Sequence, residues 1–117
     1  MDFEFRFGGV QRLFGKACFS EIQRIHVGIV GLGGVGSWTA EALARSGVGM
    51  LTLVDFDDIC ESNFNRQIHS LDGEVGKQKI DVMKERLLKI NPQLEIQLLH
   101  ERFDEDTANK VLSSGFQ

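Results

Sequence analysis

The chain has 117 residues, 42% of them hydrophobic and 26% charged, a composition that excludes an intrinsically disordered protein and fits one small domain or part of a larger one. The formal net charge of −4 provides no overall basic field, so charge alone does not predict a nucleic-acid partner. The sequence shows no disulfide framework, CxxC motif, secretory signal or apolar run of about 18 residues, so we expect a cytoplasmic protein that does not span a membrane.

An N-terminal helical segment is expected over residues 1–24. Apolar residues recur at helical spacing between Val10 and Cys18, so the pattern predicts one amphipathic helix after Gly9. The short β-branched run "IHVGIV" at 25–30 follows, and it is typical of a strand that is buried on both faces. The turn "GLGGVG" then leads into "SWTAEALARSG", whose composition favours a helix.

The second half of the chain repeats this alternation. The run "MLTLVD" at 50–55 predicts a second buried strand, and a long connection leads from it to an amphipathic helix over 77–90. The stretch "LEIQLL" at 94–99 alternates between apolar and polar residues and predicts a third strand. The last stretch, "DEDTANKVLSSG", predicts a short helix that ends before Gly115.

Strands that alternate with helices predict a parallel sheet with right-handed crossovers. The expected fold class is therefore α/β: the N-terminal half of a Rossmann-like, doubly wound sheet, with three strands, preceded by the helical segment 1–24. We expect residues 25–117 to form a partial nucleotide-binding domain that is truncated at its C-terminus, because a fourth strand would normally pair with strand 25–30. Without that strand the hydrophobic edge is open, so a missing segment or another chain is expected to cover it.

A glycine pattern, G-x-G-x-x-G, lies between the first strand and the next helix at Gly31, Gly33 and Gly36. The first glycine permits a tight turn, the second allows a phosphate to approach the backbone, and the third allows close packing of helix on strand. Alone, the pattern also fits a tight turn without a ligand. Here Asp55 ends the following strand, where its carboxylate can accept hydrogen bonds from ribose hydroxyls, so the two features together predict a bound nucleotide.

A second polar group follows the second strand: Asn63, Arg66 and Gln67 lie in the connection, and Lys79 opens the next helix. Ligands of such sheets bind beyond the carboxyl ends of the strands, so these residues are expected to face the glycine turn. A dinucleotide such as NAD needs only the turn and the ribose acid, whereas an additional arginine and lysine suit a triphosphate. The pattern favours ATP. A solvated charged surface is the alternative interpretation, and it is preferred for Lys77.

Three linked motifs, "GLGGVGS" at 31–37, "DFDDICESNFNRQ" at 55–67 and "GKQK" at 76–79, resemble those of the E1-like (ThiF/MoeB/HesA) adenylating enzymes, with the same spacing. Within this family the chain looks most like the tRNA threonylcarbamoyladenosine dehydratases, through stretches such as "RFGGVQRLFG" and "NRQIHSLDGEVGK". The activators of sulfur carriers typically begin with an R-Y-x-R-Q motif. Here the stretch that starts at Arg6 stands in its place, and Arg12 is the candidate for the missing second arginine.

The resemblance implies ATP-dependent adenylation of a carboxylate and, in the dehydratases, ring closure on tRNA with loss of water. It implies that Asp55 binds the ribose, that Arg66 and Lys79 are catalytic, and that Arg6 or Arg12 acts across a homodimer. The main protein ligand of Mg²⁺ is expected beyond residue 117, so this chain alone is expected to adenylate poorly. The residues implied to bind the nucleotide are Gly31, Gly33, Gly34, Gly36, Asp55, Asn63, Arg66, Gln67 and Lys79, with Asp57 nearby in a structural or substrate-facing role.

Three other functions stay open: an adenylyltransferase for a ubiquitin-like sulfur carrier, an NAD-dependent oxidoreductase domain, and a non-catalytic nucleotide-binding or dimerisation module. Simpler interpretations are preferred for several reactive residues. Cys60 is expected to be a buried or incidental thiol, His69 to pack near the site, His26 to lie in a buried strand without a ligand, and Trp38 to pack in the core. The solvated side of helix 77–90 is expected to carry Lys84, Arg86 and Lys89.

Overall fold

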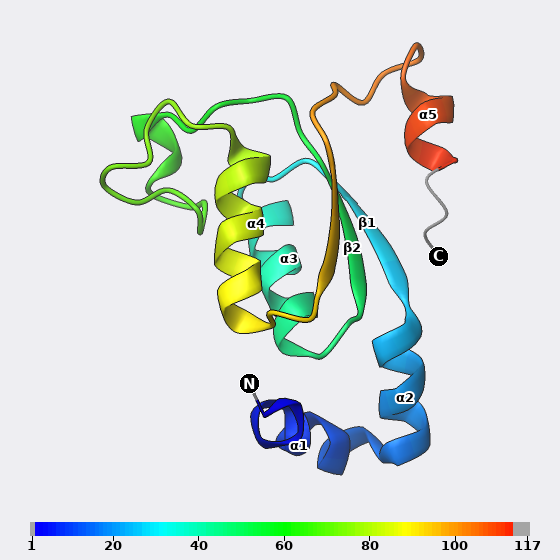
Figure 1. Cartoon of the computed structure of the whole chain (residues 1–117). Coiled ribbons are helices and arrows are strands. Elements are labelled where there is room, and N and C mark those ends of the chain that lie inside the picture. Colours follow the sequence, from blue (N-terminus) through cyan, green and yellow to red (C-terminus); the bar gives the residue numbers. More distant parts are fainter. Residues whose placement is uncertain (1, 114–117) are drawn as a thin grey trace.

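The computed structural model describes residues 2–113 and has the expected α/β architecture (Figure 1). Helix α3 (Gly36–Arg45) connects the first two strands and α4 (Lys79–Ile90) connects the second to the third. Over the described residues the structure confirms the three-stranded half of a Rossmann-like sheet. The strands are parallel in the order β1-β2-β3 and comprise β1 (His26–Val30), β2 (Met50–Val54) and β3 (Glu95–Leu99).

Both crossover helices cover the same face of the sheet (Figure 1). Right-handed crossovers between strands in the order β1-β2-β3 put each helix on the same side, so α3 and α4 also pack against each other. Alternate strand residues face them: the register pairs Leu51 with Val27 and with Ile96, and all three belong to the apolar cluster under the helices. The buried members of this cluster are Ile29, Leu32, Ala40, Ala44, Val48, Leu51, Leu53, Ile80, Met83, Leu87 and Leu94.

Strand β1 lies at an edge of the sheet, and it is not buried on both faces as expected. Ile29 is buried under the helices, whereas Val30 on the other face is 48% exposed, because β1 has a neighbouring strand on one side only. The face away from the helices carries polar contacts. His26 Nε2 lies 2.6 Å from Thr52 Oγ1, which donates to Gln97 Oε1 at 3.2 Å. Strand β2, with a neighbour on each side, is buried as expected.

The N-terminal segment contains two helices, α1 (Phe3–Phe14) and α2 (Lys16–Arg24), so the expectation of a single later helix is wrong. The first helix starts early because the Asp2 carboxylate accepts the N–H of Phe5 at 3.1 Å and caps its first turn. It ends at Gly15, whose φ of 86° is a conformation that glycine adopts without strain. The division of the chain into domains at residue 24 stays a prediction.

The two N-terminal helices lie at the end of the sheet where the strands begin (Figure 1). Arg6 holds α1 against the last turn of α4, because its Nη1 donates to Ile90 O at 2.9 Å. Helix α2 ends directly on the start of β2: a Cβ added to Gly49 would lie only 1.8 Å from Gln23 O. This arrangement leaves the opposite end of the sheet, where the strands finish, open to a ligand.

An ion pair joins α3 to α4. Arg86 donates from Nε and from Nη2 (3.2 Å) to the carboxylate of Glu41, and Arg45 also contacts it. The hydrogen bond from Arg86 lowers the pKa of Glu41, although burial acts in the opposite direction. Arg86 therefore does not lie on the solvated side of its helix as expected, since it is the partner of a buried carboxylate. Lys89 is exposed, as expected, and pairs with Glu85.

The last element is the short helix α5 (Ala108–Leu112). It ends at Leu112, before Gly115 as expected, and Gly115 itself lies outside the described residues. Within residues 2–113, none of the helices combines the length and the apolar character that crossing a membrane requires.

Candidate nucleotide-binding site

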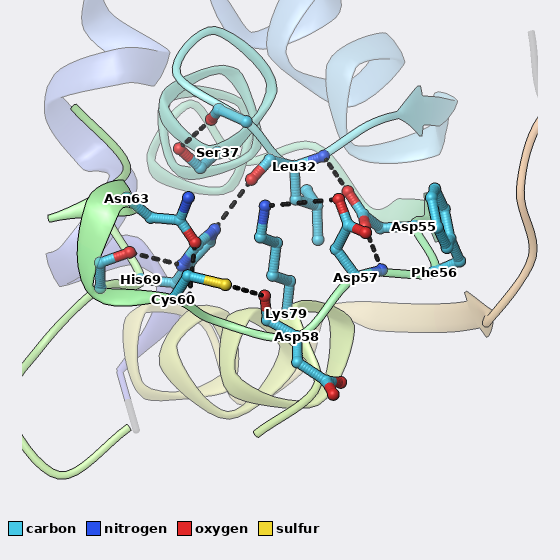
Figure 2. Close-up of polar contacts among 12 residues, drawn as sticks. Leu32, Ser37, Asp55, Phe56, Asp57, Asp58, Cys60, Asn63, His69 and Lys79 are labelled. Atoms are coloured by element: carbon cyan, nitrogen blue, oxygen red, sulfur yellow. Dashed lines mark hydrogen bonds and ion pairs between the residues drawn. The ribbon is translucent and has the colours of Figure 1, made fainter. Parts of the chain in front are cut away.

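A cavity of about 500 Å³ lies beyond the carboxyl ends of the strands. Parallel strands all finish at this edge, so the turns that follow them converge there. In Figure 2 the side chain of Lys79 extends from α4 between Asn63 and His69 on one side and Asp55 and Asp57 on the other. Seven of the nine residues implied to bind the nucleotide line this one cavity, together with Asp57: Gly31, Gly33, Asp55, Asn63, Arg66, Gln67 and Lys79.

The glycine turn after β1 is fixed at its two ends. Gly31 has φ of 90°, and its N–H donates to Val54 O at 2.7 Å, so the turn starts on strand β2. A Cβ at Gly36 would lie 1.8 Å from Gly31 O, so the first turn of α3 packs directly on the glycine turn. A Cβ at Gly34 would meet only the side chain of Arg66, 3.3 Å from Cγ. Gly31 and Gly36 therefore shape the turn, and Gly33 presents backbone to the cavity.

Asp55 follows β2, and the residue is 8% exposed. Oδ2 accepts the N–H of Leu32 at 2.7 Å, and Oδ1 accepts the N–H of Asp57 at 2.8 Å. The carboxylate thus ties the glycine turn to the end of β2, a role that the sequence did not indicate. Each oxygen keeps a second lone pair, and the residue lines the cavity, so ribose hydroxyls can reach it.

Lys79 is the first residue of α4 and is only 5% exposed. Its one ion-pair partner among residues 2–113 is Asp57, whose Oδ2 lies 3.9 Å from Nζ, farther than a hydrogen bond reaches. The Asp57 side chain is half exposed, so water screens this attraction. A buried ammonium is costly unless an anion or several acceptors approach it closely. The position of Lys79 therefore suits an anionic ligand in the cavity.

Two buried amides line the same wall. Asn63 Oδ1 accepts the N–H of Cys60 at 2.8 Å and shapes the short 3₁₀ turn η1 (Glu61–Asn63). Gln67 is buried too, and its Oε1 has no hydrogen-bond partner among the described residues. A buried acceptor without a donor costs about 1–3 kcal/mol. A ligand hydroxyl can supply that donor, and a flip of the amide presents its NH₂ group to a phosphate instead.

Arg66 lines the cavity, but its guanidinium is turned towards its own loop. Nη1 donates to Ser62 O and to Asn65 Oδ1, both at 2.9 Å, and the aliphatic part of the side chain lies over Gly34. The backbone of Arg66 is held by the glycine-turn helix, because Trp38 Nε1 donates to Arg66 O at 2.8 Å. Trp38 is 54% exposed, so the expectation of core packing is wrong. Its indole N–H needs an acceptor, which this loop provides.

The remaining candidates have simpler roles. Cys60 is exposed, and its Sγ lies 3.8 Å from Asp58 O, which fits an incidental thiol rather than a buried one. His69 is completely buried beside the site, as expected. Arg6 is engaged at the opposite end of the sheet, whereas the side chain of Arg12 makes no hydrogen bond or ion pair within the described part of the chain.

One wall of the cavity consists of residues that the sequence did not single out: Phe56, Glu101, Arg102 and Phe103. The guanidinium of Arg102 lies 5.2 Å from the centre of the Phe56 ring, a cation–π contact between the segments that follow β3 and β2. Phe56 keeps an exposed face beside the cavity, and such a face suits a stacked base. In the sequence, the one feature that could have indicated Phe56 was its position inside "DFDD", directly after a predicted strand.

Residues 2–113 contain no cluster of three or more His, Cys, Asp or Glu side chains that could hold a metal ion. Each oxygen of Asp55 already accepts one backbone N–H, and the carboxylate of Asp57 faces the ammonium of Lys79. The described residues therefore provide no cluster that would hold magnesium without oxygen ligands from a nucleotide.

Comparison with known proteins assigns a family to this arrangement. The sequence pattern of the ThiF family matches residues 9–115. The chain is 42% identical over 115 residues to the tRNA threonylcarbamoyladenosine dehydratase of Haemophilus influenzae, an alignment that covers 98% of this chain and 44% of that protein. It is 45% identical over 111 residues to the protein of the same name from Escherichia coli (strain K12), covering 95% and 41%. The chain thus spans less than half the length of these relatives.

The fold is similar to solved structures as well. The crystal structure of E. coli tRNA N6-threonylcarbamoyladenosine dehydratase, TcdA, in complex with ATP matches with a TM-score of 0.94 and 44% sequence identity, over 97% of this chain and 46% of that one. The complex of the same enzyme with AMP matches equally well.

Proposed function

This chain belongs to the ThiF family, and we propose that it forms the ATP-binding part of a tRNA threonylcarbamoyladenosine dehydratase. The observation that carries the proposal is the cavity at the strand ends, where a glycine turn, the buried ammonium of Lys79 and the unpaired amide of Gln67 face one space. The relatives that carry this name support it, since they are more than 40% identical to the chain and one of them holds ATP in its crystal structure.

The charge and donor pattern of the cavity supports a triphosphate as the ligand. Helices α3 and α4 both begin at this edge of the sheet, so the positive ends of two helix dipoles point to the same region. Lys79 adds a full positive charge that the protein itself neutralises only weakly. In this proposal Asp55 binds the ribose, the glycine turn and Lys79 bind the phosphates, and the exposed face of Phe56 receives the adenine.

The proposed reaction begins with adenylation. A carboxylate oxygen of the threonylcarbamoyl group on tRNA attacks the α-phosphorus of ATP. The bond between that phosphorus and the oxygen bridging to the β-phosphate breaks, and pyrophosphate leaves. A nucleophilic atom of the same modified nucleoside then attacks the activated carbonyl carbon and releases its proton to solvent, while AMP leaves with the former carboxylate oxygen. The nucleoside closes a ring and has lost the atoms of one water molecule.

Arg66 and Lys79 have the charge that this adenylation needs. Negative charge increases around the α-phosphorus as the carboxylate attacks, and fixed cations lower the barrier of such steps. Lys79 already lines the cavity. Arg66 is exposed, so it can exchange its contacts with Ser62 and Asn65 for phosphate oxygens by rotating its side chain, while Trp38 keeps its backbone in place.

A homodimer and a cytoplasmic location are parts of the same proposal. Of the two N-terminal arginines, Arg12 is the better candidate to act on the nucleotide of a partner subunit. Arg6 is already committed to Ile90 O inside its own subunit, whereas Arg12 has no such bond among the described residues.

Calorimetric titration of the 117-residue chain with ATP and with NAD tests the nucleotide. We expect saturable binding of ATP and none of NAD, because the cavity offers more positive charge than a dinucleotide requires. Tight binding of NAD without binding of ATP would contradict the proposal and favour an oxidoreductase domain.

Exchange of labelled pyrophosphate into ATP tests the acceptor. This assay uses the complete enzyme that contains the chain, because the chain spans less than half of its relatives. We expect exchange only with tRNA that carries threonylcarbamoyladenosine. Exchange that requires a small carrier protein ending in Gly-Gly would instead identify a sulfur-carrier adenylyltransferase.

Arg66→Ala should slow exchange by about 10²-fold, as loss of a charge contact in the transition state does. Lys77→Ala, which removes an exposed cation paired with Glu74, serves as the control and should change little.

A further inference from the structure

A buried histidine that is not among the residues lining the cavity contacts the glycine turn. His69 lies in the connection between β2 and α4 and is 0% exposed. Its Nε2 lies 2.8 Å from Leu32 O, and its Nδ1 lies 3.2 Å from Ser70 Oγ. A carbonyl oxygen can only accept, so Nε2 carries the hydrogen, and Nδ1 then accepts from the hydroxyl of Ser70.

The contact completes a clamp on one residue of the glycine turn. The N–H of Leu32 donates to Asp55 Oδ2 at 2.7 Å, while its carbonyl accepts from His69 (Figure 2). Leu32 is therefore held at the end of β2 through its N–H and at the connection to α4 through its carbonyl. The side chain of Leu32 is completely buried in the core, and this packing also restrains the position of the turn.

The next carbonyl of the turn is held in a similar way. Ser37 Oγ donates to Gly33 O at 2.5 Å and accepts the N–H of Ile68 at 3.3 Å. The carbonyls of Leu32 and Gly33 thus both point to groups linked to residues 68 and 69. This matters for an anion site, because carbonyl oxygens repel phosphate and N–H groups attract it. A turn becomes a phosphate site only if its carbonyls are directed elsewhere.

We propose that His69 is a positioning residue of the nucleotide site: by donating from Nε2 to Leu32 O, it keeps the carbonyl of Leu32 directed away from the cavity. This inference rests on the proposed ATP binding and adds a residue to it. His69 also couples the turn to the connection that carries Arg66 and Gln67, because it lies two residues after Gln67 in the same connection. ATP then meets a turn and a set of polar side chains that are already fixed relative to each other.

The electrostatic surroundings keep the ring neutral. Burial lowers the pKa of His69, and the charge of Lys79 acts in the same direction; the hydrogen bond to Leu32 and the charge of Asp55 oppose them. A neutral ring with its hydrogen on Nε2 is the form that can hold Leu32 O and accept from Ser70 at the same time.

Three variants separate positioning from general stability, with ATP affinity measured by calorimetry and Tm measured in parallel. His69→Leu leaves Leu32 O buried without a donor, and we expect ATP to bind about tenfold more weakly or worse. His69→Gln can donate from its own Nε2, so we expect it to restore affinity to within about threefold of the wild type. Ser70→Ala removes only the partner of Nδ1, and it should bind ATP like the wild type.

Two outcomes would overturn the proposal: His69→Leu that folds and binds ATP normally, or His69→Gln that is as defective as His69→Leu at an equal Tm. If His69→Leu does not fold, nitrogen NMR of the wild-type ring decides, since a hydrogen on Nδ1 rather than Nε2 excludes the bond to Leu32. Failure of the wild type to bind ATP would remove the proposed function itself, so the two failures are distinguishable.

Discussion

Replacing Gly36 by alanine should displace the glycine turn from the end of strand β1 and destabilise the protein. The added Cβ would lie 1.8 Å from Gly31 O and 2.9 Å from Gly31 C, far inside normal contact distance. Neither partner can retreat easily, because Gly31 is bonded to Val54 O and Gly36 begins a helix that packs in the core. The clash is with backbone rather than with a flexible side chain, so a change of rotamer does not relieve it.

The expected loss in free energy of unfolding is the sum of two effects of the added methyl group. Overpacking a well-packed site costs typically about 1–3 kcal/mol. Moving Gly31 also weakens its hydrogen bond to Val54 O, which contributes about 1 kcal/mol. We therefore expect Gly36→Ala to lower the free energy of unfolding by about 2–4 kcal/mol, which corresponds to a fall in Tm of roughly 10 °C for a domain of this size.

Thermal unfolding followed by circular dichroism, with ATP titration of the folded protein, measures both consequences. Gly33→Ala is the matched control: its Cβ would lie 3.9 Å from Gln67 Nε2, an ordinary contact, so Tm should hardly change while ATP binding weakens. Gly49→Ala is the second control, because its Cβ meets Gln23 O at 1.8 Å at the far end of the sheet and should lower Tm without a specific loss of ATP binding. A Gly36→Ala protein with unchanged Tm and ATP affinity would refute this reasoning.

Three further changes test the site and its support. Glu41→Gln removes the charge that Arg86 binds, and we expect urea unfolding at pH 7 to show a loss of about 1–3 kcal/mol. Because the pKa of Glu41 is lowered, its stabilisation is present above the ordinary value of 4.5 and is lost as the pH falls further, a dependence that the variant should lack. Burial lowers the pKa of His69, so as the pH falls the unfolded chain takes up a proton on this residue before the folded chain does. Tm should therefore fall as the pH drops below 6.5, and in His69→Gln this part of the fall should disappear. Lys79→Ala should weaken ATP binding about tenfold or more in calorimetry, and an effect no larger than that of Lys77→Ala would contradict a phosphate-binding role.

The order of strands and helices was predictable because it depends on local periodicity. The runs "IHVGIV" and "MLTLVD" are too short and too β-branched for helices, and the helix around Met83 shows its apolar stripe in sequence alone. The glycine turn was predictable for the same reason, since its conformation is required within six residues. The same local view missed the break at Gly15, because an apolar period continues across a residue whose φ of 86° no helix accepts.

Pairwise contacts between distant residues were not predictable. The sequence predicts that Arg86 is a surface cation, and only the packing of α3 on α4 brings Glu41 into contact with it. Trp38 reads as a core residue, yet its N–H is bonded to the loop at Arg66. Phe56 and Arg102 are in contact because β2 and β3 end at the same edge of the sheet. This contact gives the cavity an aromatic wall that the sequence motifs did not predict.

By itself, the sequence determined the α/β alternation, the glycine turn and the set of polar residues expected at the strand ends, since each depends on spacing along the chain. The tertiary structure decided how those residues are held. It placed the carboxylate of Asp55 at the N–H and the ring of His69 at the carbonyl of one residue, Leu32, and left Lys79 and Gln67 with few partners among the described residues. The physical reason is that hydrogen bonds and ion pairs depend on distances between atoms, and folding sets those distances between residues that the sequence keeps far apart.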